Sequence, residues 1–305
     1  MPDARRILVT GSTGLVGRRL VDSLRGDGLA IGAVTRRPER ARFDDGVEAV
    51  GWNGIEVAPE ELAKSSAVVH LAGEPVFGGA FSAERRRRIL ESRVDSTRAL
   101  VRAIGELAPD ERPRTFVCAS AVGYYGDRGE EELGEDAGPG TGFLADVCIA
   151  WEKAAEPVEK LGLRRVSLRI GVVLAREGGA LATMARPFRL GLGGRIGSGR
   201  QWFPWIHADD LVGLLRAVLA DEGYTGAVNA VAPNPVRNAE FTKALGAVLR
   251  RPTVLPVPAL PLRLALGELA GELLGSRRVV PRRAQERGFD FEFEDVARAL
   301  AVELG

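Results

Sequence analysis

The sequence predicts an α/β protein with a doubly wound parallel sheet and a smaller C-terminal lobe. Apolar runs of strand length alternate with longer helical patterns up to about residue 174. Parallel neighbours in a sheet need such crossover segments, so the alternation favours a parallel sheet. From Ala175 the alternation breaks, and glycine-rich and proline-rich segments follow. A chain of 305 residues is long enough to build both parts.

The composition excludes several classes of protein. The 42 basic and 41 acidic residues nearly balance, so we expect no nucleic-acid surface and no membrane-binding polybasic face. We find no signal peptide and no apolar run long enough to span a bilayer, which predicts a cytoplasmic location. The cysteines, Cys118 and Cys148, exclude a disulfide framework, and no Cys/His spacing suits zinc. We therefore expect no metal.

The first strand, turn and helix carry the strongest signal. An apolar run at residues 7–9 stops at Gly11. Gly14 and Gly17 follow at three-residue spacing, and a helical pattern comes next. Glycines let backbone N–H groups approach a pyrophosphate, and the start of the helix attracts the same anion. The alternative is a loop that only needs glycine for a positive φ. The predicted cofactor-binding residues of this turn are Gly11, Thr13, Gly14, Leu15, Val16 and Gly17.

The end of the second strand indicates which dinucleotide binds. Residues 29–35 form a buried strand that is followed by Arg36 and Arg37. NAD-binding proteins place a carboxylate here for the ribose hydroxyls, whereas a guanidinium pairs with the 2′-phosphate of NADP(H). We therefore predict NADP(H), with Arg36 as the selecting residue because it lies nearer the strand. The alternative is two exposed arginines on a loop.

The later elements place polar side chains at the carboxyl edge of the sheet. The expected elements are strands at 47–52, 67–73, 114–120 and 163–174 and helices at 81–107 and 142–160. The fifth strand delivers Ser120 and then Tyr124 to the edge where open α/β sheets bind ligands. We expect residues 126–142 to form a mobile loop over this site. His70, at the end of the fourth strand, is expected to be a packed residue and not a catalyst.

The second lobe supplies candidate substrate residues. Arg195 lies in a glycine-rich segment, and Trp202 and His207 follow it, a combination that suits a binding cleft between lobes. The alternative is a hydrophobic plug before a helix that is capped by Asp209 or Asp210.

Several of these motifs together resemble the extended, epimerase-like branch of the short-chain dehydrogenase/reductase superfamily. They are the G-x-x-G-x-x-G turn, Leu71-Ala72-Gly73, Ser120 with Tyr125-Gly126, and residues 168–171 and 207–210. Residues 151–156, 195–210 and the proline-rich tail are similar to a narrower family of uncharacterised NAD(P)-binding proteins, some labelled cell-division inhibitors. The resemblance implies that Leu71, Ala72, Gly73, Ser92, Arg169 and Gly171 also bind the cofactor.

The resemblance also implies a domain plan. Residues 1–174 would form the NADP-binding Rossmann domain, and a segment near 207–232 would return to it. Residues 175–206 and 233–305 would form the small substrate lobe. Helices 81–107 and 142–160 would form the seam of a possible homodimer, as in many relatives.

The usual catalytic pair of the superfamily is missing. The superfamily uses a serine, a tyrosine and a lysine four residues later, but aligning the helix by Glu156 puts Cys148 and Glu152 at the last two positions. The candidates for catalysis are therefore Ser120, Tyr124, Cys148 and Glu152. Three functions stay open. They are an NADP(H)-dependent oxidoreductase or epimerase for a small polar or sugar-nucleotide-like substrate, a cofactor-binding sensor or regulatory partner, and a nucleotide-sugar-binding module without redox chemistry.

Overall fold

The computed structural model describes residues 6–76, 81–267 and 269–305. By its internal contacts the chain divides into two compact units, each made of three segments of the sequence. Unit 1 comprises Met1–Ser120, Val147–Leu168 and Val212–Val228, and unit 2 comprises Ala121–Asp146, Arg169–Leu211 and Asn229–Gly305. The domain boundaries given in the sequence analysis come from the family resemblance and not from contacts, so they stay a prediction.

A seven-stranded sheet with the order β11-β7-β5-β4-β1-β2-β3 forms the centre of unit 1. Its strands are β1 (Arg6–Thr10), β2 (Ile31–Thr35), β3 (Val47–Gly51), β4 (Ser65–His70), β5 (Thr115–Ala121), β7 (Arg164–Ile170) and β11 (Gly226–Ala230). The pairs β1–β2, β1–β4, β2–β3 and β4–β5 are all parallel. The chain order reverses direction between β1 and β4, and ligands of open α/β sheets bind at such a switch point.

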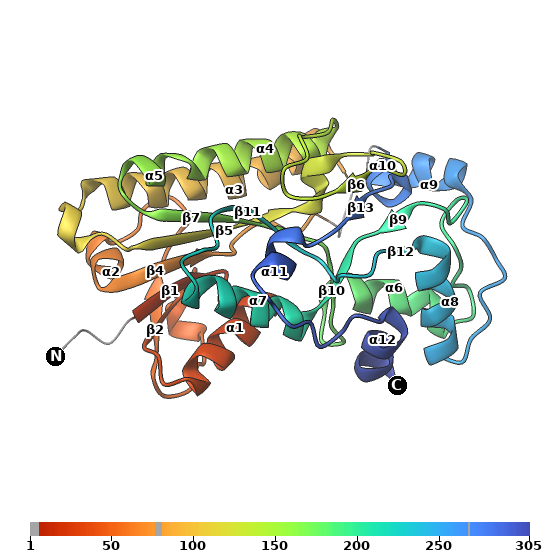
Figure 1. Cartoon of the computed structure of the whole chain (residues 1–305), viewed down its shortest axis with the longest axis horizontal. Coiled ribbons are helices and arrows are strands. Elements are labelled where there is room, and N and C mark those ends of the chain that lie inside the picture. The colour runs from red at the N-terminus through yellow and green to blue at the C-terminus, as the bar shows by residue number, and fades with distance from the viewer. Residues whose placement is uncertain (1–5, 77–80, 268) are drawn as a thin grey trace. The chain divides into compact units, whose positions relative to one another are not determined.

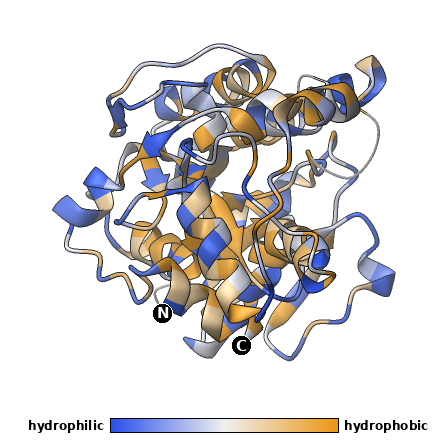
Figure 2. Ribbon diagram, turned by 90° about the vertical axis from the view of Figure 1, so that its right-hand side faces the viewer, coloured by the Kyte–Doolittle hydropathy of each residue, from blue (hydrophilic) through white to orange (hydrophobic). Residues whose placement is uncertain are grey.

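Helices cover both faces of this sheet. In Figure 1, α3, α4 and α5 lie on one face, and α1 and α7 lie on the other. Their bounds are α1 (Leu15–Gly26), α2 (Pro59–Ala63), α3 (Ala83–Glu106), α4 (Phe143–Ala155), α5 (Pro157–Lys160) and α7 (Ala208–Ala220). Most helices alternate between apolar and polar colour along their turns in Figure 2, as expected of helices that bury one face. The predicted doubly wound α/β fold is confirmed.

Unit 2 is built from short strand pairs and helices. The pairs are β6 (Glu132–Leu133) with β13 (Arg278–Val279), β8 (Val172–Leu174) with β10 (Trp205–His207), and β9 (Trp202–Phe203) with β12 (Val236–Arg237). Its helices are α6 (Gly179–Arg189), α8 (Asn238–Val248), α9 (Ala259–Leu266), α10 (Leu269–Leu274), α11 (Arg282–Glu286) and α12 (Val296–Leu304). Trp205, Phe241 and Phe293 belong to a large hydrophobic core in this unit.

Short 3₁₀ turns of the two units lie at η1 (Pro38–Arg40), η2 (Pro109–Glu111) and η3 (Val122–Tyr125).

Two predicted elements are divided in the structure. The expected helix at 142–160 is α4 followed by α5, because Pro157 has no N–H to continue the helical ladder. The expected strand at 163–174 is β7 followed by β8, which pair in different sheets. Gly171 lies between them, where a Cβ would approach the Pro204 carbonyl oxygen to 3.0 Å. The expected loop at 126–142 contains β6, whose Leu133 is buried.

A buried hydrogen-bond network fixes part of unit 2. The Tyr125 hydroxyl donates to Asn229 Oδ1 (2.7 Å) and accepts from Arg169 Nη1 (2.9 Å). Asn229 Nδ2 donates to the Val280 carbonyl (2.9 Å), and Glu135 Oε1 accepts from the Asn229 N–H (3.0 Å). Burial raises the pKa of Tyr125. The phenol therefore stays neutral and serves both as donor and as acceptor.

Removal of this hydroxyl tests the network. We expect Tyr125→Phe to lower the free energy of unfolding by about 1–3 kcal/mol, because Asn229 and Arg169 each lose a buried partner. Urea denaturation measures the change. Tyr124→Phe is the matched control, since Tyr124 is only partly buried. Equal costs for the two variants would show that the network does not stabilise the fold.

Candidate functional site

The turn after β1 is packed backbone against backbone. Gly11 has a φ of +69°, and a Cβ there would lie 2.8 Å from the Leu71 carbonyl carbon. A Cβ at Gly17 would lie only 2.2 Å from the Gly11 oxygen. No other residue fits either position without moving the backbone. The Ser12 hydroxyl donates to the Val34 carbonyl (2.8 Å) and ties the turn to β2.

The start of α1 suits an anion. Gly14 is the N-cap, it provides no side-chain hydrogen bond, and the first turn contains no acidic residue. The first N–H groups of α1 therefore have no capping side chain, and they carry the positive end of the helix dipole. Thr13 and Gly14 are exposed, while Leu15 and Val16 are half-buried. This turn fits the diphosphate of a dinucleotide.

Arg36 directly follows β2 and is exposed. In the part of the chain that the structure describes, its guanidinium has no hydrogen bond or ion pair. A free guanidinium at this strand end is positioned to pair with a phosphate on the adenosine ribose.

A buried relay connects the Leu71-Ala72-Gly73 turn to α3. The Ala72 N–H donates to Thr10 Oγ1 (3.3 Å), which lies 2.7 Å from His70 Nδ1. His70 Nε2 lies 3.1 Å from Ser96 Oγ, which donates to the Ser92 carbonyl (2.7 Å). Since Ser96 donates its proton to Ser92, the consistent assignment places the imidazole proton on Nε2.

His70 is neutral in this relay. It is fully buried, and burial together with the nearby Arg93 charge lowers its pKa to about 3. His70 is thus a packed residue at the end of β4, as the sequence predicted. Thr10 and Ser96 were missed by sequence reasoning, because neither belongs to a motif.

Three other predicted cofactor residues have internal partners. Ser92 Oγ accepts from the Glu74 N–H (3.0 Å) and donates to the Ile89 carbonyl (3.1 Å). Arg169 lies in unit 2, where Nη1 donates to Tyr125 and to the Glu135 carbonyl. The Gly171 N–H donates to the Ala230 carbonyl (3.0 Å). In the structure these three residues therefore make hydrogen bonds that hold neighbouring backbone and side chains in place.

Ser120 and Glu152 meet at the carboxyl end of β5. Ser120 Oγ donates to Glu152 Oε1 (2.7 Å), and both side chains are buried. Cys148 lies one turn earlier on α4 and is also buried. Lys153 is exposed, so it does not replace the superfamily lysine beside Ser120.

Tyr124, the fourth catalytic candidate, belongs to unit 2. It lies in η3, and its ring faces the Arg169 guanidinium at 3.5 Å. Of the four candidates, the structure thus brings Ser120 and Glu152 into direct contact, and Cys148 lies one helical turn before Glu152 on α4.

The predicted substrate residues of unit 2 differ in exposure. Arg195 is exposed and donates to the Ser198 carbonyl (2.7 Å). Trp202 is half-buried, and its indole N–H donates to Glu130 (3.1 Å). His207 is fully buried, with Nε2 3.0 Å from Glu303 Oε1 and its ring stacked on Phe293. His207 therefore packs in the core of unit 2.

Asp210, one of the two aspartates named above as alternative helix caps, has its hydrogen-bond partners in another segment of the chain. Its carboxylate accepts from the N–H groups of Glu292 (2.8 Å) and Phe293 (3.0 Å), which lie in the segment before α12. It therefore holds a distant segment, a role different from the predicted helix cap.

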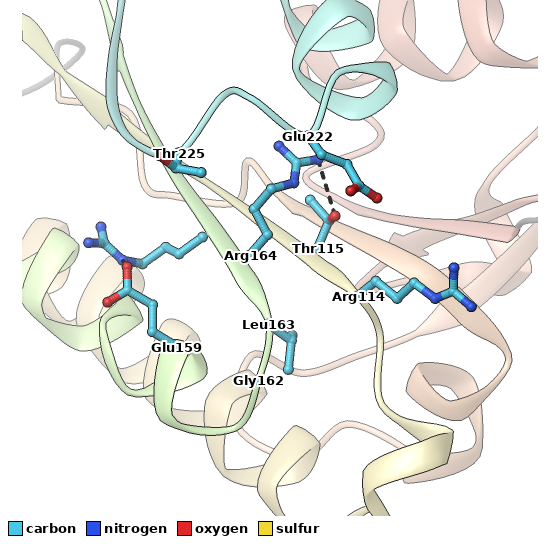
Figure 3. A pocket seen from close by; sticks show the side chains of 9 residues that line it. Arg114, Thr115, Glu159, Gly162, Leu163, Arg164, Glu222 and Thr225 are labelled. Carbon is cyan, nitrogen blue, oxygen red and sulfur yellow. Dashed lines mark hydrogen bonds and ion pairs between the residues drawn. The ribbon is translucent and has the colours of Figure 1, made fainter.

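A separate cavity of about 580 Å³ lies at the amino ends of β5 and β7 in unit 1. In Figure 3, Arg164 points to Thr115, and Arg114 extends away from them. Arg164 donates to Thr115 and to the carbonyls of Val218 and Tyr224, so its donors serve the fold. This cavity is at the opposite ends of these strands from Ser120.

A doubly wound sheet with a glycine turn at its switch point defines a Rossmann-type nucleotide-binding protein. Residues 7–230 match the model of the NAD dependent epimerase/dehydratase family, and the chain belongs to that family. Residues 257–302 match a domain of unknown function. The resemblance to extended, epimerase-like short-chain dehydrogenases is confirmed.

Relatives match along nearly the whole chain. The chloroplastic SDR39U1 homolog of Arabidopsis thaliana is 43% identical over 96% of this chain and 85% of its own. Mouse (Mus musculus) SDR39U1 is 39% identical over 97% of this chain and 98% of its own. The crystal structure of human SDR39U1 (isoform 2) with NADPH has a TM-score of 0.84 at 34% identity and covers 98% of this chain and 99% of its own. A nucleoside-diphosphate sugar epimerase from Corynebacterium glutamicum has a TM-score of 0.79 at 34% identity, over 99% of this chain and 59% of its own.

Membrane-spanning and metal-binding features are absent from the described residues. No described helix has the length and apolar character needed to cross a membrane. The described histidine, cysteine, aspartate and glutamate side chains form no group of three or more that is arranged to hold a metal ion.

The buried His70 relay makes a pH-dependent contribution to the free energy of unfolding. Unfolded His70 takes up a proton near pH 6.5, whereas folded His70 resists protonation until about pH 3. The stabilisation is complete above pH 6.5 and is lost as the pH falls through this window, by up to about 1.4 kcal/mol per pH unit. We expect the free energy of unfolding to fall less steeply between pH 6 and pH 4 in His70→Asn. Denaturant titrations at several pH values measure both slopes, and identical slopes would refute the buried neutral imidazole.

Proposed function

We propose that this protein is an NADP(H)-dependent oxidoreductase or epimerase for a small polar or sugar-nucleotide-like substrate. The observation that carries the proposal is the close-packed glycine turn before the uncapped start of α1. The human relative crystallised with NADPH supports the same cofactor. The Corynebacterium relative, described as a nucleoside-diphosphate sugar epimerase, supports the substrate class.

The residues of unit 1 fit the proposed cofactor. The backbone of residues 11–17 and the first turn of α1 hold the diphosphate, and Arg36 pairs with the 2′-phosphate. The Leu71-Ala72-Gly73 turn borders the same switch point and is held by the His70 relay. When bound, the dinucleotide supplies or accepts a hydride.

Ser120 and Glu152 move the proton in the proposed reaction. In the oxidation direction, Ser120 Oγ takes the proton of a substrate hydroxyl while its own proton passes to Glu152 Oε1. Reduction runs the same transfers in reverse. The 2.7 Å contact between these atoms is the geometry that such a relay needs. Glu152 thus replaces the lysine of the superfamily with a proton acceptor of opposite charge.

Arg195 and Trp202 are the proposed substrate residues of unit 2. Arg195 is exposed, and Trp202 offers an aromatic ring that the Arg237 guanidinium already faces at 4.3 Å. Guanidinium groups and an aromatic ring suit the phosphates and base of a nucleotide sugar. Tyr124 and Cys148 remain proposed secondary acids.

A second candidate function follows from the missing Tyr-Lys pair. Helix α4 carries Cys148 and Glu152 at those positions, so the protein is alternatively a cofactor-binding sensor or regulatory partner. The two candidates differ in one measurement. A sensor changes its association with another protein when NADP(H) binds, and it shows no turnover. The cytoplasmic location and the homodimer also stay proposals.

The 2′-phosphate assignment predicts a selective loss. We expect Arg36→Ala to weaken NADPH binding at least about tenfold and to leave NADH binding nearly unchanged, because only NADPH carries the paired phosphate. Isothermal titration calorimetry measures both affinities. Arg37→Ala is the control for a nearby lost charge. Equal losses for the two cofactors would contradict the assignment.

The proposed proton transfer from Ser120 to Glu152 predicts a variant with a lower turnover rate and unchanged cofactor affinity. We expect Glu152→Gln to lower turnover by about 10²-fold or more, since its amide cannot take the proton from Ser120. NADPH affinity should stay unchanged. A screen of carbonyl compounds and sugar nucleotides, followed by NADPH absorbance, finds the substrate. Glu156→Gln, which removes an exposed carboxylate four residues later in the sequence, is the charge control. Undiminished turnover in Glu152→Gln would remove the relay from the mechanism.

A further inference from the structure

Glu130 is the centre of an exposed hydrogen-bond cluster that lies entirely in unit 2. Its Oε1 accepts from Arg237 Nη1 (3.1 Å), and its Oε2 accepts from Arg237 Nη2 (2.8 Å) and from the Trp202 indole N–H (3.1 Å). The Arg237 guanidinium also faces the Trp202 ring, with Cζ 4.3 Å from the ring centre. Two parallel hydrogen bonds from a guanidinium are the geometry by which arginine binds the carboxylates and phosphates of ligands.

The two donors are held in place independently of Glu130. Trp202 and Arg237 are opposite each other in the antiparallel pair of β9 and β12. The Trp202 backbone N–H donates to Ser276 Oγ (3.2 Å), and Arg237 Nη1 also donates to the Arg200 carbonyl. The indole N–H and the guanidinium therefore keep their positions when the Glu130 carboxylate leaves them.

The segment that carries Glu130 is also anchored by other residues. The Ser276 N–H donates to Asp127 Oδ1 (3.0 Å), and Ser276 Oγ donates to the Gly129 carbonyl (2.7 Å). The Glu130 side chain is 66% exposed, and its ion pair with Arg237 lies at the surface, where such pairs contribute little to stability. The carboxylate can therefore rotate into water while the backbone around it stays in place.

The charge of Glu130 makes it a competitor of any anion at this position. Hydrogen bonds from Arg237 and from Trp202 lower the pKa of Glu130, so its carboxylate is ionised at neutral pH. A second negative group at the same guanidinium is repelled by this carboxylate. An anionic ligand of Arg237 therefore has to displace Glu130.

We propose that Trp202 and Arg237 form a binding site for a phosphate or carboxylate group of the substrate, and that Glu130 occupies this site until that group displaces it. The inference rests on the proposed function, adds Arg237 to its substrate residues and narrows the substrate class to anions. Glu130 thereby determines specificity. A neutral group does not replace the charge-assisted bonds that Arg237 loses, whereas a phosphate or carboxylate does.

Ligand titrations of the wild type and of charge-neutralised variants test this proposal. The probes are UDP, malonate and the uncharged uridine, titrated by calorimetry with saturating NADPH, which keeps UDP away from the proposed diphosphate turn. We expect Glu130→Gln to bind UDP and malonate at least about tenfold more tightly than the wild type, because its amide does not repel an anion. Adding Arg237→Gln to this variant should remove the gain. Glu131→Gln is the matched control, since it neutralises the next carboxylate, which pairs with Arg128, and it should bind like the wild type.

The outcomes separate this inference from the proposed function. A gain for UDP alone supports a phosphate site, and a gain for malonate alone supports a carboxylate site. Unchanged or weaker binding of both by Glu130→Gln would overturn the inference, as would an equal gain in Glu131→Gln, for uridine, or in the double variant. If the wild type does not bind NADPH, the proposed function fails, and titrations without NADPH still decide the anion site. Thermal unfolding of each variant verifies that it is folded.

Discussion

The close approach of three backbone segments at the switch point is the constraint on which the site depends. The turn after β1, the first residues of α1 and the turn after β4 touch without intervening side chains, as the short Cβ distances at Gly11 and Gly17 show. This packing leaves main-chain N–H groups at the start of α1 with no capping partner. Such a helix start, free of capping side chains, suits an anion.

The buried imidazole of His70 extends this constraint to α3. Its two ring nitrogens face hydroxyls of β1 and α3, and the hydroxyl of Thr10 in turn receives the Ala72 N–H. A charged imidazole would be poorly solvated here and would face the Arg93 charge, so the neutral form is strongly favoured. The relay thereby connects the Leu71-Ala72-Gly73 turn to α3.

The sequence predicted what depends on local pattern. Apolar runs located the strands, and glycine spacing located the turn, because both signals come from consecutive residues. The roles that depend on distant partners were missed: the His207 ring stacks on Phe293, and the Asn229 amide accepts from the Tyr125 hydroxyl.

The proposed mechanism operates without the superfamily lysine. Glu152 places a negative charge beside Ser120, where the lysine would place a positive one. A carboxylate at this position repels an anionic substrate unless a cation compensates for it. In the proposed mechanism, Glu152 accepts a proton at the position where the superfamily has a lysine.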